Sequence, residues 1–353
     1  MLNYISAKQA ALKWGISQRR VALLCAQNRI EGVIFNKNRW LIPENAKKPS
    51  DLRTKLAQQE NEAKPFLKWA GGKSQLLANV HEQINSYEDF KLKKYVEPMV
   101  GSGAVLFEIL ATHNLESVYI SDVNKGLINT YKVIRDDIDV LIESLSNVQT
   151  IYYSLSQEQR KGKYYEIRDE YNATPIKNSN RVQKATEFIF LNKTCFNGLY
   201  RENKKGDFNV PMGEYKSPKI LDEANLRLVS KALQGVTIKC ADFSASLDYI
   251  DENTLVYLDP PYRPISKTAN FNSYTSNSFD DDEQIRLAKF IKNIDKKGAK
   301  FILSNSDPQN TDESDDFFHK LYGDYTIRKI EAKRCINSIA KKRGKISELL
   351  IYN

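Results

Sequence analysis

The sequence has few of the residues that build metal centres, disulfide frameworks or histidine-based catalytic triads. Its four cysteines (Cys25, Cys195, Cys240 and Cys335) lie far apart and form no C-x-x-C pair, and its three histidines are isolated. Zinc sites and disulfide bridges are therefore not expected, and no metal cofactor is predicted. Such a chain suits a reducing compartment, so we expect a cytoplasmic protein.

Long apolar runs are missing as well. No segment approaches the roughly 20 apolar residues that a membrane span needs, so no membrane association is expected. The first residues, MLNYISAK, also lack the apolar centre of a signal peptide. With 41% hydrophobic and 27% charged residues, the 353-residue chain has the composition of an ordinary globular protein with two or three domains.

Positive charge is concentrated in two parts of the chain, whose formal net charge is +9. Residues 1–60 contain 11 Lys or Arg and 4 Asp or Glu, and residues 328–345 contain 8 and 1. Two separated basic clusters suggest that the protein contacts a polyanion such as a nucleic acid at two places. Two solvated surfaces would have the same composition, so charge alone leaves both interpretations open.

Residues 1–48 predict a small N-terminal domain with two helices and a two-stranded wing. Ser6 and Ser17 are placed to cap the helices, and a short glycine-containing turn between the helices gives a helix-turn-helix outline. Arg19 and Arg20 begin the second helix, where a recognition helix contacts DNA. The segment resembles the winged helix-turn-helix modules of the MerR and excisionase kind. Its positive charge and the basic wing favour DNA binding. A helical hairpin that contacts proteins is the alternative.

A polar segment at residues 49–63 is predicted to be a linker, because it has almost no large apolar residue. The second predicted domain comprises residues 64–353. Within it, residues 140–235 are expected to form a mostly helical and loop-rich insertion.

The second domain begins with FLKWAGGKS, in which Gly71 and Gly72 allow the backbone to come close to a ligand. The GGKS sequence resembles the end of a phosphate-binding P-loop, but Leu67 stands where that motif has its first glycine. An aromatic ring (Trp69) and a cation (Lys73) beside the glycine pair fit a small zwitterionic ligand with a carboxylate.

A Gly-x-Gly turn at Gly101 and Gly103 follows an apolar strand and precedes an amphipathic helix. A second apolar strand, starting at Val118, ends in Asp122 roughly 20 residues further on. This spacing places a carboxylate near ribose hydroxyls in nucleotide-binding βαβ units. The third glycine of the dinucleotide motif is absent, which favours a ligand with a nucleoside but no pyrophosphate. A Rossmann-like turn with a surface Asp122 is the alternative.

Two more apolar strands end in an acid. The strand from Val236 ends in Asp242 and Phe243, a pair that can hold adenine by its amine and its face. The strand at 254–258 is a continuous apolar run, which is typical of a parallel sheet covered on both faces. Ligands bind at the carboxyl ends of such strands.

The segment TLVYLDPPY at 254–262 suits chemistry on an exocyclic amine. Its two prolines stop the strand and remove two amide donors, which leaves Asp259 at the strand end. The Asp259 carboxylate and the Pro260 carbonyl can accept the two amine hydrogens and so expose the nitrogen lone pair. Tyr262 offers a face on which a flipped base can stack. A strand that merely ends in a turn is the alternative.

The loop at 188–219 interleaves aromatic residues with Gly, Asn and Lys. Long loops of this kind are functional or disordered, and the aromatic content argues against disorder. Aromatic rings among amides and cations suit insertion between bases and hydrogen bonding with them. Further along the chain, the four acids at 280–283 precede a predicted helix. They are interpreted as caps that the helix dipole favours rather than as metal ligands.

Taken in order, the motifs FLKWAGGK, EPMVGSG, SDVN, CFNGLYREN and DPPY resemble the DNA adenine-N6 methyltransferases of the Dam and DpnM type. The resemblance covers about residues 64–353, and the ending RGKISELLI resembles the DpnM branch. Residues 1–63 depart from the minimal family pattern. The resemblance implies an α/β, Rossmann-like methyltransferase fold with an inserted helical and loop region that recognises duplex DNA. The expected enzyme is a site-specific adenine methyltransferase of a restriction–modification system or of its phage or solitary relatives.

The resemblance also implies S-adenosylmethionine as the methyl donor. The target adenine would be flipped out of the duplex and held against Asp259, Pro260 and Tyr262, without a metal. The residues that would bind the donor are Trp69 and Lys73 at its methionine end, Gly101 and Gly103 at the turn, Asp122 at the ribose, Asp242 and Phe243 at the adenine, and Asp259 between donor and base.

In this family a loop reads the DNA site, commonly GATC. The matching residues are Lys68 for the outer guanine, Phe196 and Asn197 for the gap beside the flipped base, Arg201 for a guanine, and Leu199 and Pro211 for a thymine methyl. We expect a monomer or a weak dimer. Two alternatives remain from the sequence: a methyltransferase acting on cytosine N4 or on RNA adenine, and a DNA-binding regulator whose methyltransferase body is not catalytic.

Overall fold

The computed structural model describes residues 3–27, 29–36, 39–49, 61–69, 73, 75–203, 205–263, 279–333 and 345–353. Most of the predicted linker, the pair Gly71–Gly72, the tip of the predicted wing and the basic segment 334–344 lie outside the described residues. The chain divides into two compact units, Met1–Glu62 and Ala63–Asn353, and each is described by itself.

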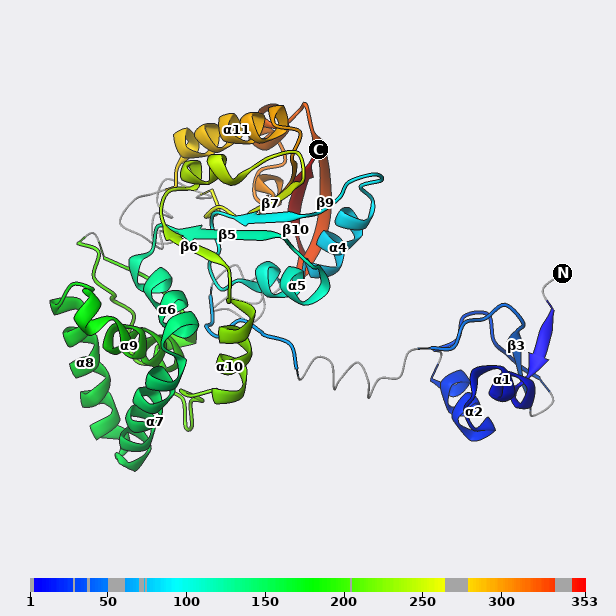
Figure 1. Ribbon diagram of the computed structural model, residues 1–353, viewed down its shortest axis with the longest axis horizontal. Helices are drawn as coiled ribbons and strands as arrows, with labels where there is room; N and C mark the ends of the chain where they lie inside the picture. Colours follow the sequence, from blue (N-terminus) through cyan, green and yellow to red (C-terminus); the bar gives the residue numbers. More distant parts are fainter. Residues whose placement is uncertain are drawn as a thin grey trace. The chain divides into compact units, whose positions relative to one another are not determined.

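The N-terminal unit combines a three-stranded antiparallel sheet of order β1-β3-β2 with two helices (Figure 1). Its elements are β1 (Tyr4–Ser6), α1 (Ala7–Trp14), α2 (Gln18–Ala26), β2 (Ile34–Asn36) and β3 (Arg39–Pro43). Strand β1 was not expected from the sequence, because three residues are too few to show a strand alternation.

Both helices of this unit begin at the predicted serines. The Ser6 hydroxyl accepts the backbone N–H of Gln9, and the Ser17 hydroxyl accepts that of Arg20. Gly15 ends α1 with a φ of 62°, a left-handed conformation that suits glycine. The helices and β3 enclose a small apolar core whose fully buried members are Ala10, Val21, Cys25 and Ile42.

The larger unit is built on a sheet whose described strands have the order β6-β5-β4-β7-β8-β10-β9. The neighbours from β6 to β8 are parallel, and β10 runs antiparallel to both β8 and β9. The strands are β4 (Lys94–Glu97), β5 (Ser117–Asp122), β6 (Thr237–Cys240), β7 (Thr254–Leu258), β8 (Lys300–Ser306), β9 (Thr326–Lys333) and β10 (Lys345–Tyr352).

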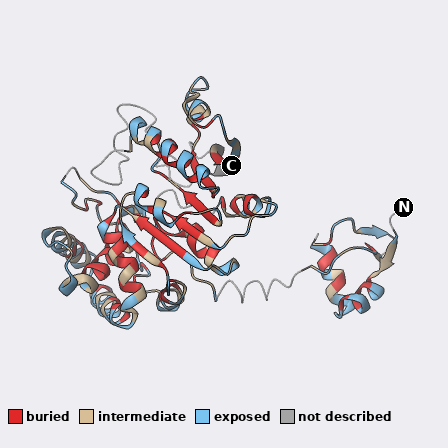
Figure 2. Cartoon of the chain, turned by 45° about the horizontal axis from the view of Figure 1, so that its top comes forward, coloured by how far each residue is buried: buried red, intermediate tan, exposed pale blue. Residues whose placement is uncertain are grey.

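Helices cover both faces of this sheet. Figure 2 shows the buried residues along its strands. In β7, Leu255 and Tyr257 pack on one face, and Val256 and Leu258 pack on the other. This explains the continuous apolar run, because neither face of the strand meets water. One face is covered by α11 (Asp281–Lys296) and α12 (Phe317–Leu321), and the other by α4 (Leu77–Asn85), α5 (Ala104–Thr112), α6 (Lys125–Asp136) and α10 (Glu223–Ala232).

The strand order reverses between β4 and β7. From β4 the chain continues to β5 and β6 on one side, and it then returns to place β7 on the other side. In open α/β sheets, ligands bind outside the carboxyl ends of the strands at such a point. The segments that follow β4 and β7 therefore flank the expected ligand site.

Three further helices, α7 (Ile138–Ser154), α8 (Gln157–Ala173) and α9 (Arg181–Thr194), pack beside α6 (Figure 1). Lys184 and Glu187 of α9 form a buried ion pair at 2.8 Å. The Lys184 ammonium also donates to the Glu170 carbonyl of α8. The Tyr164 hydroxyl of α8 donates to the Val210 carbonyl at 2.7 Å. The helices thus support the loop that follows α9.

The contact between α6 and α9 has no room for a side chain at Gly126. A Cβ there would lie 2.3 Å from the Tyr171 hydroxyl and 2.9 Å from the Phe188 ring. We predict that Gly126→Ala lowers the free energy of unfolding by about 1–3 kcal/mol through overpacking.

The matched control is Gly162→Ala in α8, where a Cβ would meet no atom within 4 Å. It should stabilise the protein by about 0.5–1 kcal/mol, because alanine is the better helix former. Urea unfolding of the two variants measures both effects. Equal or greater stability of Gly126→Ala would contradict the packing argument.

Candidate active site

The carboxylate of Asp259 lies at the end of β7, a strand buried along its whole length. Its Oδ1 atom is 3.0 Å from the Lys73 ammonium and accepts the Ser304 hydroxyl at 3.0 Å. Burial raises the pKa of the Asp259 carboxyl above its usual value, and Lys73 and Ser304 oppose that shift. Pro260, which follows, is buried.

Lys73 is the cation of this cluster, and its side chain is only 4% exposed. Its ammonium donates to the Tyr262 hydroxyl at 2.5 Å and lies 4.4 Å from the centre of the Tyr262 ring. Burial alone would lower the pKa of Lys73, but the Asp259 and Glu348 carboxylates help to raise it well above its ordinary value. The structure therefore brings Lys73, predicted at the donor, into contact with the residues predicted to hold the acceptor base.

Two members of the cluster were missed by sequence reasoning. Ser304 lies in β8 beside β7, and Glu348 lies in β10 with its Oε2 atom 3.6 Å from the Lys73 ammonium. An acid inside the apolar strand sequence ISELLIY was the signal that could have found Glu348. Ser304 carried no comparable signal.

The Gly-x-Gly turn leads from β4 into α5. Gly101 and Gly103 have φ of 49° and 73°, and Gly103 precedes the first residue of α5. The Gly101 amide donates to Oδ2 of Asp122 at 3.2 Å, while Oδ1 accepts the Asn124 amide at 2.9 Å. Burial raises the pKa of Asp122, and these backbone amides partly offset the shift.

Trp69 packs directly on this turn. A Cβ at Gly101 would lie 3.0 Å from its indole ring, so only glycine allows this approach without a shift. On the other side, the indole stacks on Tyr200 with ring centres 5.3 Å apart. Trp69 therefore connects the turn after β4 with the loop that follows α9.

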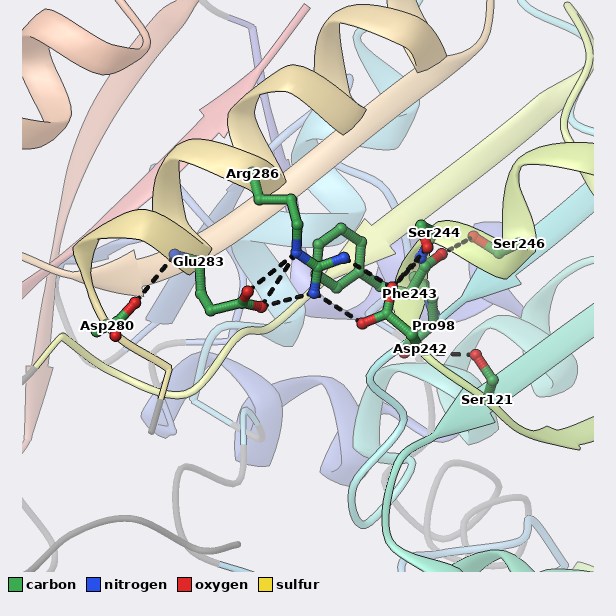
Figure 3. A network of polar contacts seen from close by, with 9 residues as sticks. All are labelled: Pro98, Ser121, Asp242, Phe243, Ser244, Ser246, Asp280, Glu283 and Arg286. Atoms are coloured by element: carbon green, nitrogen blue, oxygen red, sulfur yellow. Dashed lines mark hydrogen bonds and ion pairs between the residues drawn. The ribbon is translucent and has the colours of Figure 1, made fainter. Parts of the chain in front are cut away.

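Asp242 follows β6, next to Asp122 at the end of β5, since the Ala241 amide donates to the Asp122 carbonyl at 3.2 Å. Both carboxylate oxygens of Asp242 bind the Arg286 guanidinium, each at 2.8 Å (Figure 3). This pairing holds the pKa of Asp242 well below its usual value, although burial opposes it. Phe243 is 3% exposed, and the Arg286 guanidinium lies 4.0 Å from its ring centre.

Arg286 and its pairing with Glu283, in the first turns of α11, were also missed. The Asp280 carboxylate does cap the helix, as predicted, by accepting the Glu283 amide at 3.1 Å. Glu283, interpreted from the sequence as another acid that the helix dipole favours, lies in the first turn and also pairs with Arg286 at 2.6 Å. The three-residue spacing of an acid and an arginine on a helix was the available signal.

The loop after α9 has its own support. The Phe196 amide donates to the Pro211 carbonyl at 2.9 Å, and the Arg201 guanidinium donates to the Asn209 side chain at 2.8 Å. Phe196 is 51% exposed, and Arg201 and Pro211 are exposed, whereas Leu199 packs partly against the core. Asn197 has a φ of 56°, a left-handed turn conformation.

Lys68 lies against this loop. Its backbone exchanges hydrogen bonds with the Asn192 side chain of α9, at 3.0 and 2.8 Å. A Cβ at Gly198 would lie 2.4 Å from the Lys68 side chain, and the Lys68 ammonium is 4.8 Å from the Tyr215 ring centre. Lys68 therefore lies against the predicted recognition loop. The other predicted DNA-binding residues, Arg19 and Arg20, belong to the N-terminal unit.

Glu97 ends β4, beside β7. It is 2% exposed, and its Oε2 atom accepts the Tyr95 hydroxyl at 2.6 Å. Burial raises the pKa of Glu97 to about 8, and the Asp259 carboxylate adds to this shift.

Within the described parts of the chain, no group of His, Cys, Asp and Glu could hold a metal ion. The helices described there are also too short or too polar to cross a membrane.

Comparison with known proteins decides the family. The family model described as D12 class N6 adenine-specific DNA methyltransferase matches residues 69–336. The chain belongs to this family. The chain is 51% identical to the type II methyltransferase M.MjaIII of Methanocaldococcus jannaschii, over 83% of this chain and 99% of the relative. It is 35% identical to type II methyltransferase M1.LlaDCHI of Lactococcus lactis subsp. cremoris, over 84% and 98%. The DNA adenine methylase of Escherichia coli K12 is 31% identical, over 81% and 93%.

The buried Glu97 should make the stability of the methyltransferase domain depend on pH. The unfolded chain loses this proton near pH 4.5 and the folded protein near pH 8, so Glu97 stabilises the fold fully below pH 4.5. We predict that this contribution falls by up to about 1.4 kcal/mol per pH unit as the pH rises toward 8.

Urea unfolding of wild type and Glu97→Gln between pH 5.5 and 8 measures the effect. Glu97→Gln should show the flatter profile, because its amide does not titrate. Glu143→Gln, at an exposed position of α7, should keep the wild-type slope. Parallel profiles for wild type and Glu97→Gln would contradict the prediction.

Proposed function

We propose that this methyltransferase transfers a methyl group from S-adenosylmethionine to N6 of an adenine flipped out of duplex DNA. One observation carries the proposal. The ion-paired carboxylate of Asp259 and the carbonyl of the buried Pro260 lie at the carboxyl end of β7, at the point where the strand order reverses. The Gly101 turn and Asp122 follow β4 and β5 at the same edge of the sheet.

The residues at this edge fit the donor. Each carboxylate oxygen of Asp122 accepts a backbone amide, at 2.9 and 3.2 Å, and retains capacity to accept a ribose hydroxyl. The close packing of Trp69 on Gly101 brings an aromatic face and bare backbone together. We assign Trp69, Gly101, Gly103 and Asp122 to the donor, with Asp242 at the amine of its adenine. The donor when bound supplies an electrophilic methyl group on a sulfonium.

The acceptor chemistry depends on Asp259. Its Oδ1 atom already accepts Lys73 and Ser304, so Oδ2 is the oxygen we assign to one N6 hydrogen of the adenine. The Pro260 carbonyl accepts the other, and the N6 lone pair is then free for in-line attack on the methyl carbon. As the carbon–nitrogen bond forms and the carbon–sulfur bond breaks, N6 transfers one proton to Asp259.

We propose a role for Lys73 that differs from the one expected at the donor's carboxylate. Its ammonium is committed to Asp259 and Tyr262, with Glu348 at 3.6 Å. We propose that it keeps Asp259 ionised and fixes the Tyr262 ring against which the flipped base stacks.

The loop after α9 suits DNA recognition. Phe196, 51% exposed, is available to fill the gap that a flipped base leaves, together with Asn197. Arg201 and Lys68 supply donors for guanine edges, and the exposed Pro211 supplies contact to a thymine methyl. Leu199 is less accessible for that contact, because it packs partly against the core.

We infer GATC as the site, and a restriction–modification context from relatives named as type II methyltransferases. We place the protein in the cytoplasm and expect a monomer or weak dimer.

We further propose that residues 1–48 form a winged helix-turn-helix domain that adds DNA affinity or represses transcription. Helix α2 begins at Gln18, which presents Arg19 and Arg20 in its first turn, and β2 and β3 form the wing. The linker at 49–63 would join it to the methyltransferase domain.

Replacing Asp259 tests the catalytic proposal. Asp259→Asn keeps the side-chain volume but loses the charge and the proton acceptor. We predict at least a 100-fold fall in methyl transfer to duplex DNA, with cofactor binding retained. Tritium transfer from S-adenosylmethionine and mapping of modified bases measure it.

Asp248→Asn, at an exposed position of the same unit, is the control and should methylate normally. Near-wild-type activity of Asp259→Asn would contradict the mechanism. Methylation of cytosine N4 or of RNA would contradict the assigned acceptor, and N6-methyladenine outside GATC would contradict only the site.

Charge removal tests the N-terminal domain. The double variant Arg19→Gln, Arg20→Gln should weaken DNA binding and lower the slope of log affinity against log salt by about 1–2, with cofactor binding unchanged. The control Lys292→Gln, Lys296→Gln removes the same charge from exposed positions of α11. Fluorescence anisotropy at several salt concentrations measures both. An equal slope in wild type and the arginine variant would contradict the proposal.

A further inference from the structure

The Arg286 guanidinium contacts both residues that were predicted to hold the donor's adenine. It binds the two carboxylate oxygens of Asp242 at 2.8 Å each, and it lies 4.0 Å from the centre of the Phe243 ring (Figure 3). An arginine fork of this geometry fixes the plane of the carboxylate as well as its charge. Arg286 therefore controls how Asp242 is presented at this edge of the sheet.

The two carboxylate oxygens of Asp242 differ in how many further hydrogen bonds they can accept. Oδ1 accepts three donors, the Ser244 amide at 3.0 Å, the Ser244 hydroxyl at 2.6 Å and Nη1 of Arg286 at 2.8 Å. Oδ2 accepts Nη2 of Arg286. Because a carboxylate oxygen has about two lone pairs, Oδ1 is saturated, and Oδ2 retains one acceptor position with respect to the described residues.

Phe243 is not available as a stacking face in this arrangement. Its side chain is 3% exposed, packs edge-on against Phe290 with ring centres 5.3 Å apart, and meets the Arg286 guanidinium on one face. Recognition of the adenine at this position then depends on the amine and Oδ2 of Asp242. The ring of Phe243 instead gives Arg286 an apolar surface to lie on.

Arg286 is itself held from the opposite side. Glu283, one turn earlier in α11, accepts its Nε atom at 3.1 and 3.2 Å and its Nη2 atom at 2.6 Å. With two carboxylates and a ring around it, the guanidinium has one orientation, although it is 40% exposed. Ion pairs between partly exposed charges contribute little to stability. The contacts of Arg286 with Asp242 and Glu283 therefore act mainly on the orientation of these side chains.

We propose that Arg286 is a positioning residue for the donor's purine, which orients Asp242 so that Oδ2 accepts the 6-amino group. The proposal rests on the donor assignment made above and deepens it. It predicts that removal of Arg286 affects only ligands that carry the amine. A guanidinium that merely competes with adenine for Asp242 would have the opposite effect on affinity.

Calorimetric binding of two ligands tests the proposal in the full-length protein. One ligand is S-adenosylhomocysteine, and the other is its analogue with hydrogen in place of the 6-amino group. Wild type should prefer the amine by about tenfold or more, which is a difference of roughly 1.4 kcal/mol. Arg286→Met should lose most of this preference by weaker binding of S-adenosylhomocysteine alone, and KM for S-adenosylmethionine should rise with kcat little changed.

Two further variants separate positioning from folding. Arg227→Met removes a comparable arginine, which lies on α10 and pairs with Glu223 and with Asp139 of α7, and it should keep the wild-type preference. Arg286→Lys retains the charge without the fork and should lose part of the preference.

Three results would overturn the inference: tighter binding of S-adenosylhomocysteine by Arg286→Met, equal weakening of both ligands, or an unchanged preference. Equal binding of both ligands by wild type would instead overturn the role of Asp242 in the proposed function, and the role of Arg286 with it.

Discussion

The ion pair between Lys73 and Asp259 is the interaction around which the site is organised. Both groups lie at the carboxyl end of β7, and the Lys73 side chain is 4% exposed. Removal of two charges from water costs several kcal/mol per ion, and a pair recovers this only with good geometry and further hydrogen bonds. Ser304, Tyr262 and Glu348 provide those contacts. A buried pair of this kind is weak evidence for stability, so its value lies in holding an ionised carboxylate in one place.

The sheet topology makes this cluster possible. β7 is central, and β8 beside it supplies Ser304 at the same level as the strand end. β10 runs antiparallel to β8, so that Glu348 in its first half pairs with Ser306 at the end of β8. A parallel strand in that position would bring its last residues, not its first, to the carboxyl edge. The reversal of one strand therefore delivers a second carboxylate to Lys73.

How much of this could be predicted depends on how local each signal is. The apolar run 254–258, the prolines after Asp259 and the glycines at 101 and 103 are local patterns, and they predicted the strand end and the turn correctly. Ser304, Glu348 and Arg286 reach the site only through strand order and helix packing, which no short window of sequence contains. Lys73, Asp259 and Tyr262 were each predicted as site residues, but their mutual contacts were not, because these depend on how the chain after β7, the β10 residue Glu348 and Lys73 meet in space.

Two carboxylates at this edge of the sheet are held by cations of different kinds, and their pKa values move in opposite directions. Burial raises the pKa of Asp259, whose partner is a compact ammonium that contacts Oδ1 at 3.0 Å. The Arg286 fork lowers the pKa of Asp242, which favours its ionised form as an acceptor. Groups whose environments separate their pKa values in this way suit different tasks. In the proposed mechanism, the carboxyl with the raised pKa takes the proton that the amine loses on methylation, and the carboxyl with the lowered pKa recognises an amine without changing its own charge.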